Sequence, residues 1–236
     1  MTTGTTRPLP ATARARARAS ISAEIKAAAL RQIQAEGAPS LSLRAVAREV
    51  GMVSSAVYRY YTSRDELLTG LIVDAYDALG EAAEEGEAAV ARRDLRGRWL
   101  ATGRAVRAWA LGHPHEYALI HGSPVPGYAA PDATIGPATR VPRLLMGILE
   151  DHHALGGQPR RLVTRIPAAV RSDLRAIQAA LATDVPDGLL LAGLAGWTEL
   201  YGTVSFEIFG QLQNVIAERD GYFDIQMRRI ADDFGL

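Results

Sequence analysis

The 236-residue sequence contains no cysteine, has few aromatic residues (6%) and carries no formal net charge, because 26 basic residues balance 26 acidic ones. Without cysteine the chain cannot form a disulfide scaffold, a thiolate zinc site or a cysteine nucleophile. No apolar run approaches the roughly 18 residues that span a bilayer, and the N-terminus lacks the apolar core of a secretory signal. We therefore expect a cytoplasmic protein with no membrane partner. The hydrophobic fraction of 48% is typical of a globular protein.

The sequence also lacks the motifs of the common enzyme classes. It has no GxSxG, no Walker loop, no HExxH and no GxGxxG after a strand. Its histidines are poorly spaced for a metal, because His113 and His115 lie two apart across Pro114, and His152 and His153 are adjacent. We therefore expect no metal and no cofactor.

The absence of net charge hides an asymmetry along the chain. Residues 1–70 carry 10 basic and 5 acidic residues, a balance of +5, whereas residues 71–236 carry 16 and 21, a balance of −5. A basic N-terminal part joined to an acidic C-terminal part indicates that the N-terminal part binds a polyanion. An architectural nucleic-acid-binding protein would need basic charge throughout, and the acidic second region disfavours it.

Residues 1–19 have the composition of a flexible, arginine-rich arm. They show no apolar periodicity, and Arg14, Arg16 and Arg18 alternate with alanine. Such an arm would lie on DNA phosphates or in a minor groove. A solvated tail and an N-terminal extension of the first helix are equally compatible with these residues, and the alternatives stay open.

From residue 20 onward every segment has helical periodicity, and no stretch alternates apolar and polar residues as a strand would. The fold class is therefore all-α. The stretch 122–134 holds several prolines and is expected to be a loop. The predicted helices span residues 20–36, 42–50, 54–60, 64–85, 95–112, 114–121, 141–153, 167–182, 187–215 and 222–234.

Residues 42–60 have the pattern of a helix-turn-helix, in which the second helix enters the major groove of DNA. Gly51 lies in the turn, and Ala47 is small enough to let the two helices approach. Ser54 and Ser55 begin the second helix, where small side chains allow close contact with base edges. An ordinary pair of packed helices would show the same bare pattern.

Polar side chains at the end of this second helix suit the DNA backbone. Tyr58 and Tyr60 supply hydroxyl donors, and Arg59 adds positive charge. Ser63 follows, and Glu66 stands three positions later, which is the form of a capping box at the start of the next helix. Ser42 and Ser54 are likewise expected to cap the two helices of the motif.

Residues 20–70 resemble the DNA-binding domain of the TetR family of bacterial one-component transcription regulators. The matching sequence is LSLRAVAREVGMVSSAVYRYYTSRDELL, residues 41–68. It has the family's alanine at Ala47, its turn glycine at Gly51 and its recognition-helix tyrosine at Tyr58. The serine-led run that opens the next helix of the family also matches.

The resemblance implies which residues meet DNA, with Ser54 and Ser55 facing bases. Val53, Tyr60 and Tyr61 stand where Ser, His and Phe are common in the family, so the operator sequence does not follow from the resemblance. The implied phosphate contacts are Ser42, Tyr58, Tyr60 and Arg64, and the full predicted DNA-binding set also includes Arg44 and Arg59.

Residues 107–135 and 197–210 resemble the effector domains of a subset of the same family, with a His-Pro pair after a helix and a late Trp-x-Glu-aromatic-Gly helix. Such proteins are all-helical homodimers, usually repressors that a small molecule releases from DNA. Aromatic residues of this region are candidates for an apolar effector pocket, with the loop 122–134 as a lid, although a place in the core is the commoner role for any single one of them. The predicted effector contacts are Trp109, Tyr117, His121, Tyr128 and Trp197.

The long helix predicted from Asp187 carries an apolar seam, and its glycines Gly193, Gly196, Gly202 and Gly210 would let another helix approach. A two-fold operator needs two recognition helices about one helical turn apart, so a dimer suits DNA binding. We expect this helix and the last one to form a four-helix dimer interface, with packing inside one chain as the alternative. The predicted interface residues are Leu194, Trp197, Tyr201, Val204, Ile208 and Leu212.

The expected protein is a homodimeric, ligand-responsive transcriptional regulator whose partners are double-stranded operator DNA, a second copy of itself and an unidentified small-molecule effector. Release by the effector would make it a repressor. A ligand-independent DNA-binding protein or an activator is the alternative, and an enzyme is a more distant one. The expected organisation is a flexible arm (1–19), a three-helix helix-turn-helix domain (20–68) and a larger effector-binding and dimerisation domain (69–236).

Overall fold

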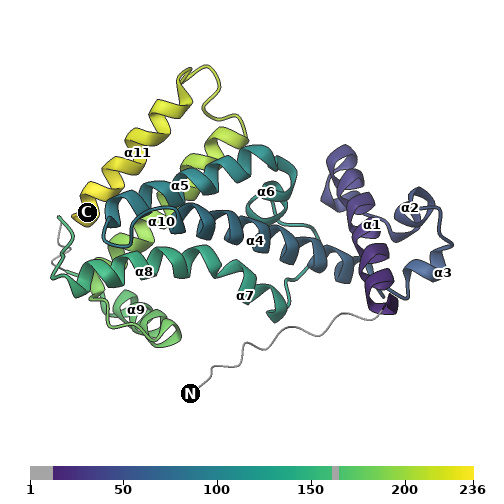
Figure 1. Ribbon diagram of the computed structural model, residues 1–236, viewed down its shortest axis with the longest axis horizontal. Helices are drawn as coiled ribbons and strands as arrows, with labels where there is room; N and C mark the ends of the chain where they lie inside the picture. The colour runs from purple at the N-terminus through teal and green to yellow at the C-terminus, as the bar shows by residue number, and fades with distance from the viewer. Residues whose placement is uncertain (1–12, 161–164) are drawn as a thin grey trace. The chain divides into compact units, whose positions relative to one another are not determined.

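The computed structural model describes residues 13–160 and 165–236, and the fold of these ranges is all-α, with no strand (Figure 1). No helix within them is long and apolar enough to cross a membrane. Short helices are only marginally stable alone, so each depends on burying one apolar face against its neighbours.

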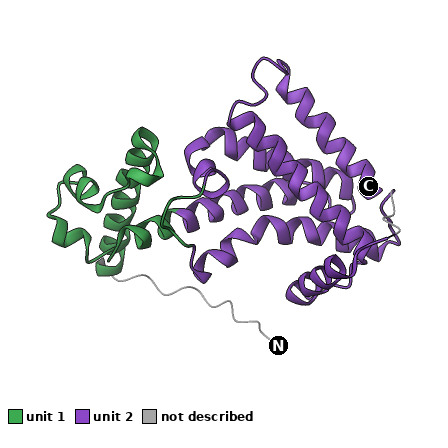
Figure 2. Ribbon diagram, turned by 180° about the vertical axis from the view of Figure 1, so that it is seen from behind, with its two compact units in different colours: residues 1–71, 124–129 green, residues 72–123, 130–236 purple. Residues whose placement is uncertain are grey.

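The chain divides into two compact units, which Figure 2 shows in different colours. The division falls inside a helix, after Leu71. Part of the predicted loop, residues 124–129, packs with unit 1 although it is distant in sequence. Unit 1 comprises the described residues 13–71 and 124–129, and unit 2 comprises residues 72–123, 130–160 and 165–236.

Unit 1 is built on its first helix. Ile25 on that helix, Val46 and Val57 are fully buried together in the core. The hydroxyls of Ser22 and Tyr61 share a hydrogen bond of 2.7 Å. This bond joins the first helix to the short segment that precedes Arg64. The elements are α1 (Ala13–Glu36), the 3-10 helix η1 (Ala38–Ser40), α2 (Leu43–Glu49), α3 (Ser54–Val57) and the start of α4 (Arg64–Ala88).

The first helix begins earlier than the sequence predicts. Residues 13–19, expected within a flexible arm, form the first turns of α1, and residues 1–12 lie outside the described residues. Alanine and arginine alternate in these turns and both have high helix propensity, so the helix extends without a buried face. For residues 13–19 the arm is therefore corrected to a helical extension.

Unit 2 is arranged around α5, which packs against α6, α8, α10 and α11. Most predicted helix ends lie within three residues of the observed ones. The predicted loop 122–134 contains a short 3-10 helix at its end. The elements are α5 (Leu95–Gly112), α6 (Pro114–His121), η2 (Asp132–Thr134), α7 (Ile135–Ala138), α8 (Arg140–Ala154), α9 (Ala168–Leu181), α10 (Asp187–Ile208) and α11 (Arg219–Phe234).

Helix α5 is capped at its start and anchored along its buried face. The carboxylate of Asp94 accepts the Gly97 amide at 2.8 Å, which satisfies a free amide of the first turn. The indole N–H of Trp99 donates to the carbonyl of Met227 in α11 at 2.9 Å. The same ring packs edge-on against Phe234, with 4.9 Å between centroids. These contacts hold α11 against α5.

The same helix carries a buried arginine. The Arg98 side chain is only 1% exposed, and its guanidinium donates to Glu87 of α4 and, at 2.6 Å, to Asp151 of α8. A buried charge is tolerated only when it is paired and hydrogen-bonded. Arg98 therefore ties α4, α5 and α8 together at one point.

Helix α10 ends at Ile208, whereas the apolar spacing predicted a continuation to residue 215. Gly210 has a φ of +80°, a left-handed conformation that glycine adopts without strain, and the backbone turns after it. Leu212 lies in this turn and is 9% exposed. The apolar spacing in the sequence extends past Ile208 because Leu212, in the turn after the helix, also packs against the protein.

Arg98→Met is expected to lower the free energy of unfolding by about 3–5 kcal/mol, because Glu87 would lose its buried partner and keep only the longer 3.6 Å pair with the exposed Arg92. Urea denaturation at fixed protein concentration measures the change. Arg104→Met on the same helix is the matched control, since the Arg104–Asp224 pair is largely exposed and should contribute less than about 1 kcal/mol. Equal losses in the two variants would contradict the role assigned to burial.

Candidate nucleic-acid and ligand sites

Helices α2 and α3 form the predicted helix-turn-helix. Gly51 lies in the turn with a φ of +70°, a backbone conformation that residues with a side chain rarely adopt. The Met52 amide donates to the Ala47 carbonyl at 2.9 Å and closes the end of α2. Ala47 and Val57 are fully buried. The small alanine and the buried valine let α3 lie against its neighbours with its other side outward.

The predicted DNA-binding residues differ in exposure. A DNA phosphate can reach an exposed side chain without any rearrangement of unit 1, whereas a half-buried side chain offers only part of its polar surface. Contact with DNA stays a prediction for all eight of them. Arg44, Ser55, Tyr58 and Arg59 are exposed, and Ser42, Ser54, Tyr60 and Arg64 are half-buried.

Two of the three predicted serine caps do not form. Ser42 occupies the N-cap position of α2 without a side-chain capping bond, and its amide donates to Gln32 Oε1 at 3.1 Å. Val53 is the N-cap residue of α3, so Ser54 is already the first helical residue. The reason is local geometry: position in the sequence does not decide which way a short hydroxyl points.

The third cap forms at the start of α4. The Ser63 hydroxyl accepts the Glu66 amide at 3.1 Å. The Glu66 carboxylate turns back to Thr62, from which it accepts the hydroxyl at 2.7 Å and the amide at 2.6 Å, and these bonds lower the pKa of Glu66. The capping box is therefore displaced by one residue, with Thr62 in place of Ser63 as the partner of the glutamate.

Arg64 is held by partners within unit 1. One terminal nitrogen donates to the carbonyls of Ala38 at 3.0 Å and Pro39 at 3.3 Å, and the other pairs with Asp65 at 3.3 Å. These bonds join η1 to the start of α4. A phosphate contact by Arg64 would use the donors that remain.

The first turns of α1 lie beside α3. The Arg18 guanidinium donates to the Arg59 carbonyl at 3.2 Å, and its central carbon lies 4.9 Å from the centroid of the Tyr60 ring. Arg14 and Arg18 are exposed. The helical extension therefore brings positive charge next to the tyrosines that the sequence assigned to phosphates.

The predicted effector residues have several different environments. Tyr128 belongs to unit 1, where its hydroxyl shares a hydrogen bond of 2.9 Å with Thr69. Trp109 of unit 2 is 8% exposed and stacks on His113 with 5.0 Å between centroids. Both side chains have structural contacts of their own, and an effector role stays a prediction for each.

Tyr117, His121 and Trp197 are linked by a row of rings within unit 2. The His121 ring lies 5.0 Å from that of Tyr117, 4.4 Å from that of Tyr201 and 5.9 Å from that of Tyr76. Tyr201 in turn lies 6.1 Å from Trp197. The row joins α10 to α6 and α4.

The centre of this row is buried and incompletely hydrogen-bonded. Nε2 of His121 has no hydrogen-bond partner, and burial lowers the pKa of His121 to about 4, so its imidazole is neutral at pH 7. Burial also raises the pKa of Tyr117 to about 12, against a hydrogen bond of 2.8 Å to Ser205. A buried ring nitrogen without a partner is able to bind a polar group of a ligand.

An apolar cavity of about 210 Å³ lies between α8, α9 and α10. No side chain that lines it is charged, and the indole N–H of Trp197 is the one polar side-chain group among them. The sequence predicted Trp197 as an effector contact but not the walls from α8 and α9, because an amphipathic pattern does not distinguish a cavity from packed core. The lining residues are Pro142, Leu145, Met146, Leu149, Ile177, Leu181, Gly193, Leu194 and Trp197.

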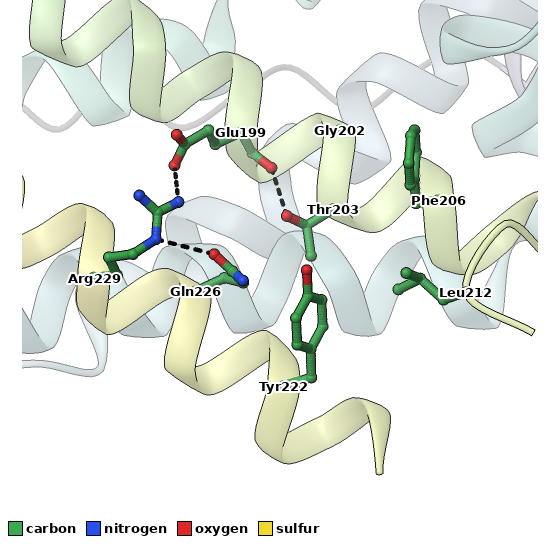
Figure 3. Close-up of a pocket in the computed structure, with 8 residues that line it drawn as sticks. All are labelled: Glu199, Gly202, Thr203, Phe206, Leu212, Tyr222, Gln226 and Arg229. Atoms are coloured by element: carbon green, nitrogen blue, oxygen red, sulfur yellow. Dashed lines mark hydrogen bonds and ion pairs between the residues drawn. The ribbon is translucent and has the colours of Figure 1, made fainter. Parts of the chain in front are cut away.

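A surface groove runs between α10 and α11 (Figure 3). Arg229 of α11 reaches Glu199 of α10 at 2.7 Å and Gln226 at 3.1 Å, and Phe206 is 55% exposed near the other end. A side chain at Gly202 would point into open space. The groove is lined by Glu199, Gly202, Thr203, Phe206, Leu212, Tyr222, Gln226 and Arg229.

The predicted dimer residues divide between the core and the surface. Val204 is fully buried within the chain, so it is corrected from an interface residue to a core residue. Leu212 lines the groove, and Trp197 is 39% exposed. Spacing could not separate the two roles, because α10 is apolar around much of its circumference. Leu194, Tyr201 and Ile208 are half-buried against the core.

The glycines of α10 divide in the same way. A Cβ at Gly193 would lie 2.4 Å from Leu149 Cδ1, and one at Gly196 would lie 2.4 Å from Phe234 Cζ. These two glycines let α8 and α11 approach α10 within the chain. Gly202, in contrast, is open to an approach from outside.

Two family descriptions match the sequence. "Bacterial regulatory proteins, tetR family" matches residues 25–71, and "Tetracyclin repressor-like, C-terminal domain" matches residues 99–230. The HTH-type transcriptional regulator Rv1816 of Mycobacterium tuberculosis is 40% identical over 213 residues, which cover 88% of this chain and 89% of that protein.

Solved structures share the fold. The crystal structure of a regulatory protein, SCO4313, is 34% identical with a TM-score of 0.74 and covers 94% of this chain and 100% of that chain. A TetR family transcription regulator from Marinobacter aquaeolei VT8 is 16% identical with a TM-score of 0.61, covering 92% and 97%, and this likeness shows the fold alone.

The free energy of unfolding is expected to fall as the pH falls from 6.5 towards 4, partly because of His121. Its pKa is about 4 when folded against a usual 6.5, so in this window the unfolded chain binds a proton that the folded chain does not. The full difference corresponds to about 3 kcal/mol. Urea denaturation at several pH values should show a shallower acid slope for His121→Phe.

The matched control is His115→Phe, which removes an exposed imidazole of the same helix and should keep the acid slope of the natural protein. If His121→Phe kept that slope as well, His121 would not be the buried neutral group described here.

Proposed function

Because the chain belongs to the TetR family of bacterial transcriptional regulators, we propose that it is a homodimeric repressor that a small-molecule effector releases from operator DNA. The family is one of regulators and not of enzymes, and its helix-turn-helix domain binds DNA. In the proposed division of roles, residues 20–68 bind DNA, and residues 69–236 bind the effector and hold the dimer.

The exposed side of α3 is the observation that carries the DNA-binding role of particular residues. Ser55, Tyr58 and Arg59 are exposed, while Val57 between them is fully buried. The helix and the turn that follows it, residues 58–60, thus offer hydroxyl and guanidinium donors to the outside, while Val57 anchors the helix in the core. We propose that its first turn faces bases in the major groove and that its end meets phosphates.

Residues next to α3 would contact the DNA backbone. Ser42 and Arg44 stand at the start of α2, and Arg64 stands at the start of α4. Ser54 would face bases beside Ser55, and Tyr60 would contact a phosphate with Arg18 stacked on its ring. The exposed Arg14 would add a contact that the family motif does not include.

We infer that α10 and α11 of two copies form a four-helix interface. Phe206 is 55% exposed and Ile225 on α11 is 65% exposed, and large exposed apolar side chains mark interaction surfaces. Gly202 gives a partner helix room to approach. A two-fold interface of this kind would also supply the two recognition helices that a two-fold operator needs.

The effector signal is proposed to travel through the row of rings to α4. Trp197, Tyr201, His121 and Tyr76 contact one another in that order, from α10 to α4. Helix α4 is also the helix that follows the DNA-binding residues in the chain. An effector that favours one arrangement of these rings would shift the equilibrium between DNA-bound and released dimers.

The double variant Tyr58→Phe/Tyr60→Phe is expected to bind DNA from the region upstream of its own gene roughly 10- to 30-fold more weakly, because two hydroxyl contacts to phosphates are lost. Unrelated DNA should lose a similar factor, because phosphate contacts carry no sequence information. Fluorescence anisotropy with labelled duplexes at moderate salt measures both affinities.

Tyr61→Phe is the matched control, because the Tyr61 hydroxyl is bonded to Ser22 and its side chain is buried. It should leave the affinity unchanged. Ser55→Arg should instead change the preference among operator variants, as expected for a residue at base edges. Full affinity in the double tyrosine variant would overturn this docking of α3.

Gly202→Glu is expected to dissociate the dimer, because each copy would place a carboxylate where a partner helix must approach. A Cβ at this position would meet no atom of its own chain within 4 Å, so folding should be preserved. Gly147→Glu in α8 is the matched control, since that glycine also faces open space. Analytical ultracentrifugation at micromolar concentration should give a monomer for Gly202→Glu and a dimer for Gly147→Glu. A dimer in both variants would reject this interface.

A further inference from the structure

Building on the function proposed above, we propose that the effector is a small uncharged apolar molecule and that it binds in the cavity between α8, α9 and α10. Its chemical class is that of a medium-length aliphatic alcohol, ketone or ester, or of a single alkylated aromatic ring. Size, lining chemistry and wall construction each support this class.

The size of the cavity sets the size of the ligand. A protein cavity of roughly 150 Å³ holds one benzene molecule. The cavity of about 210 Å³ is larger, so it accepts a benzene ring with a short side chain or a chain of comparable bulk.

The lining of the cavity sets the polarity of the ligand. Leu145 and Met146 of α8 and Leu194 of α10 contribute aliphatic or thioether surface, and no charged side chain lines the cavity. An ionised group buried there would lose its hydration without gaining a partner, which is strongly unfavourable. Trp197 carries the one N–H donor among the lining side chains, and in the proposed complex its indole N–H donates to one ligand oxygen. An alcohol, ketone or ester oxygen matches that donor.

Two of the walls are held firmly, and the third is held lightly. Gly193 allows Leu149 to pack directly on α10, because a Cβ there would lie 2.4 Å from Leu149 Cδ1. By contrast, Leu174 is the one residue of α9 that is buried, and Ile177 and Leu181 of α9 cover the cavity. A helix with so little buried surface opens at low free-energy cost, so α9 is the wall that can admit a ligand.

Trp197 connects the cavity to the rest of unit 2. It lines the cavity, is 39% exposed, and packs edge-on near Tyr201, which contacts His121. A ligand in the cavity therefore touches the first member of the row of rings proposed to carry the signal. Neither His121 nor Tyr201 needs to touch the ligand for this to happen.

The test uses the full-length protein and a series of simple probes in isothermal titration calorimetry. We expect 1-octanol to bind, and the affinity to rise roughly fourfold for each CH2 from 1-hexanol to 1-octanol, as burial of apolar surface predicts. Octanoate, which has the same chain length and a charge, should bind at least about 10-fold more weakly. Equal or tighter binding of octanoate would overturn the uncharged class.

Variants test whether the cavity is the site. Met146→Trp fills the cavity and should weaken octanol binding roughly 10-fold or more. Leu155→Trp at the end of α8 is the matched control, because Leu155 is 76% exposed and does not line the cavity, and binding should be unchanged. Leu181→Ala enlarges the cavity and should shift the preference from 1-octanol to 1-decanol, which keeps the test decisive if Met146→Trp does not fold. An unchanged preference in Leu181→Ala would reject the site.

A gel shift with the upstream DNA separates this inference from the proposed function. If octanol fails to bind while the dimer still binds the DNA, the ligand class and site are wrong and the DNA-binding function stands. If octanol binds in the cavity and the DNA complex weakens, both are supported. If octanol binds in the cavity without weakening the DNA complex, the site is supported and release by that ligand is rejected.

Discussion

Burial of α5 is the constraint on which the larger unit depends. Four other helices of unit 2 pack against it, and its buried face combines a large ring, Trp99, with a charge, Arg98. Trp99 fixes α11 through the Met227 carbonyl, and Arg98 fixes α4 and α8 through Glu87 and Asp151. Because a buried arginine must keep its partners, these helices have little freedom to slide past α5. Because α5, α8 and α11 are held in place, the neighbouring helix α10 packs against surfaces of fixed shape.

Helix α10 of unit 2 takes part in both proposed sites, because three of its sides meet different surroundings. Leu200 and Val204 face the core, Leu194 and Trp197 face the apolar cavity, and Phe206 lines the groove toward α11. One helix therefore takes part in folding, in the proposed ligand site and in the proposed dimer. A ligand that moves Trp197 acts on the same helix that is proposed to hold the two copies together. This shared element gives the proposed coupling between effector and DNA a physical basis.

Local patterns predicted the helices and the helix-turn-helix well, and they failed where the decision was not local. The turn at Gly51 and the cap at Ser63 involve neighbours within a few residues, so spacing revealed both of them. The site residues of unit 2 were harder. Of the aromatic residues predicted to form one pocket, Trp109 and Tyr128 lie apart from the row of rings that links the others, and the cavity is lined mainly by aliphatic residues of α8, α9 and α10. Aliphatic residues look alike in a sequence whether they fill a core or leave a space.

The sequence by itself determined the all-α class, the family and the basic, tyrosine-rich front, because helical periodicity, a long motif and charge are all written in the order of residues. Only the tertiary structure decided that residues 13–19 extend α1, that Val204 belongs to the core and that Gly202 faces outward. It also revealed the cavity beside Trp197. The physical reason is that periodicity identifies an apolar face, whereas the partner of that face depends on which helices the chain brings together.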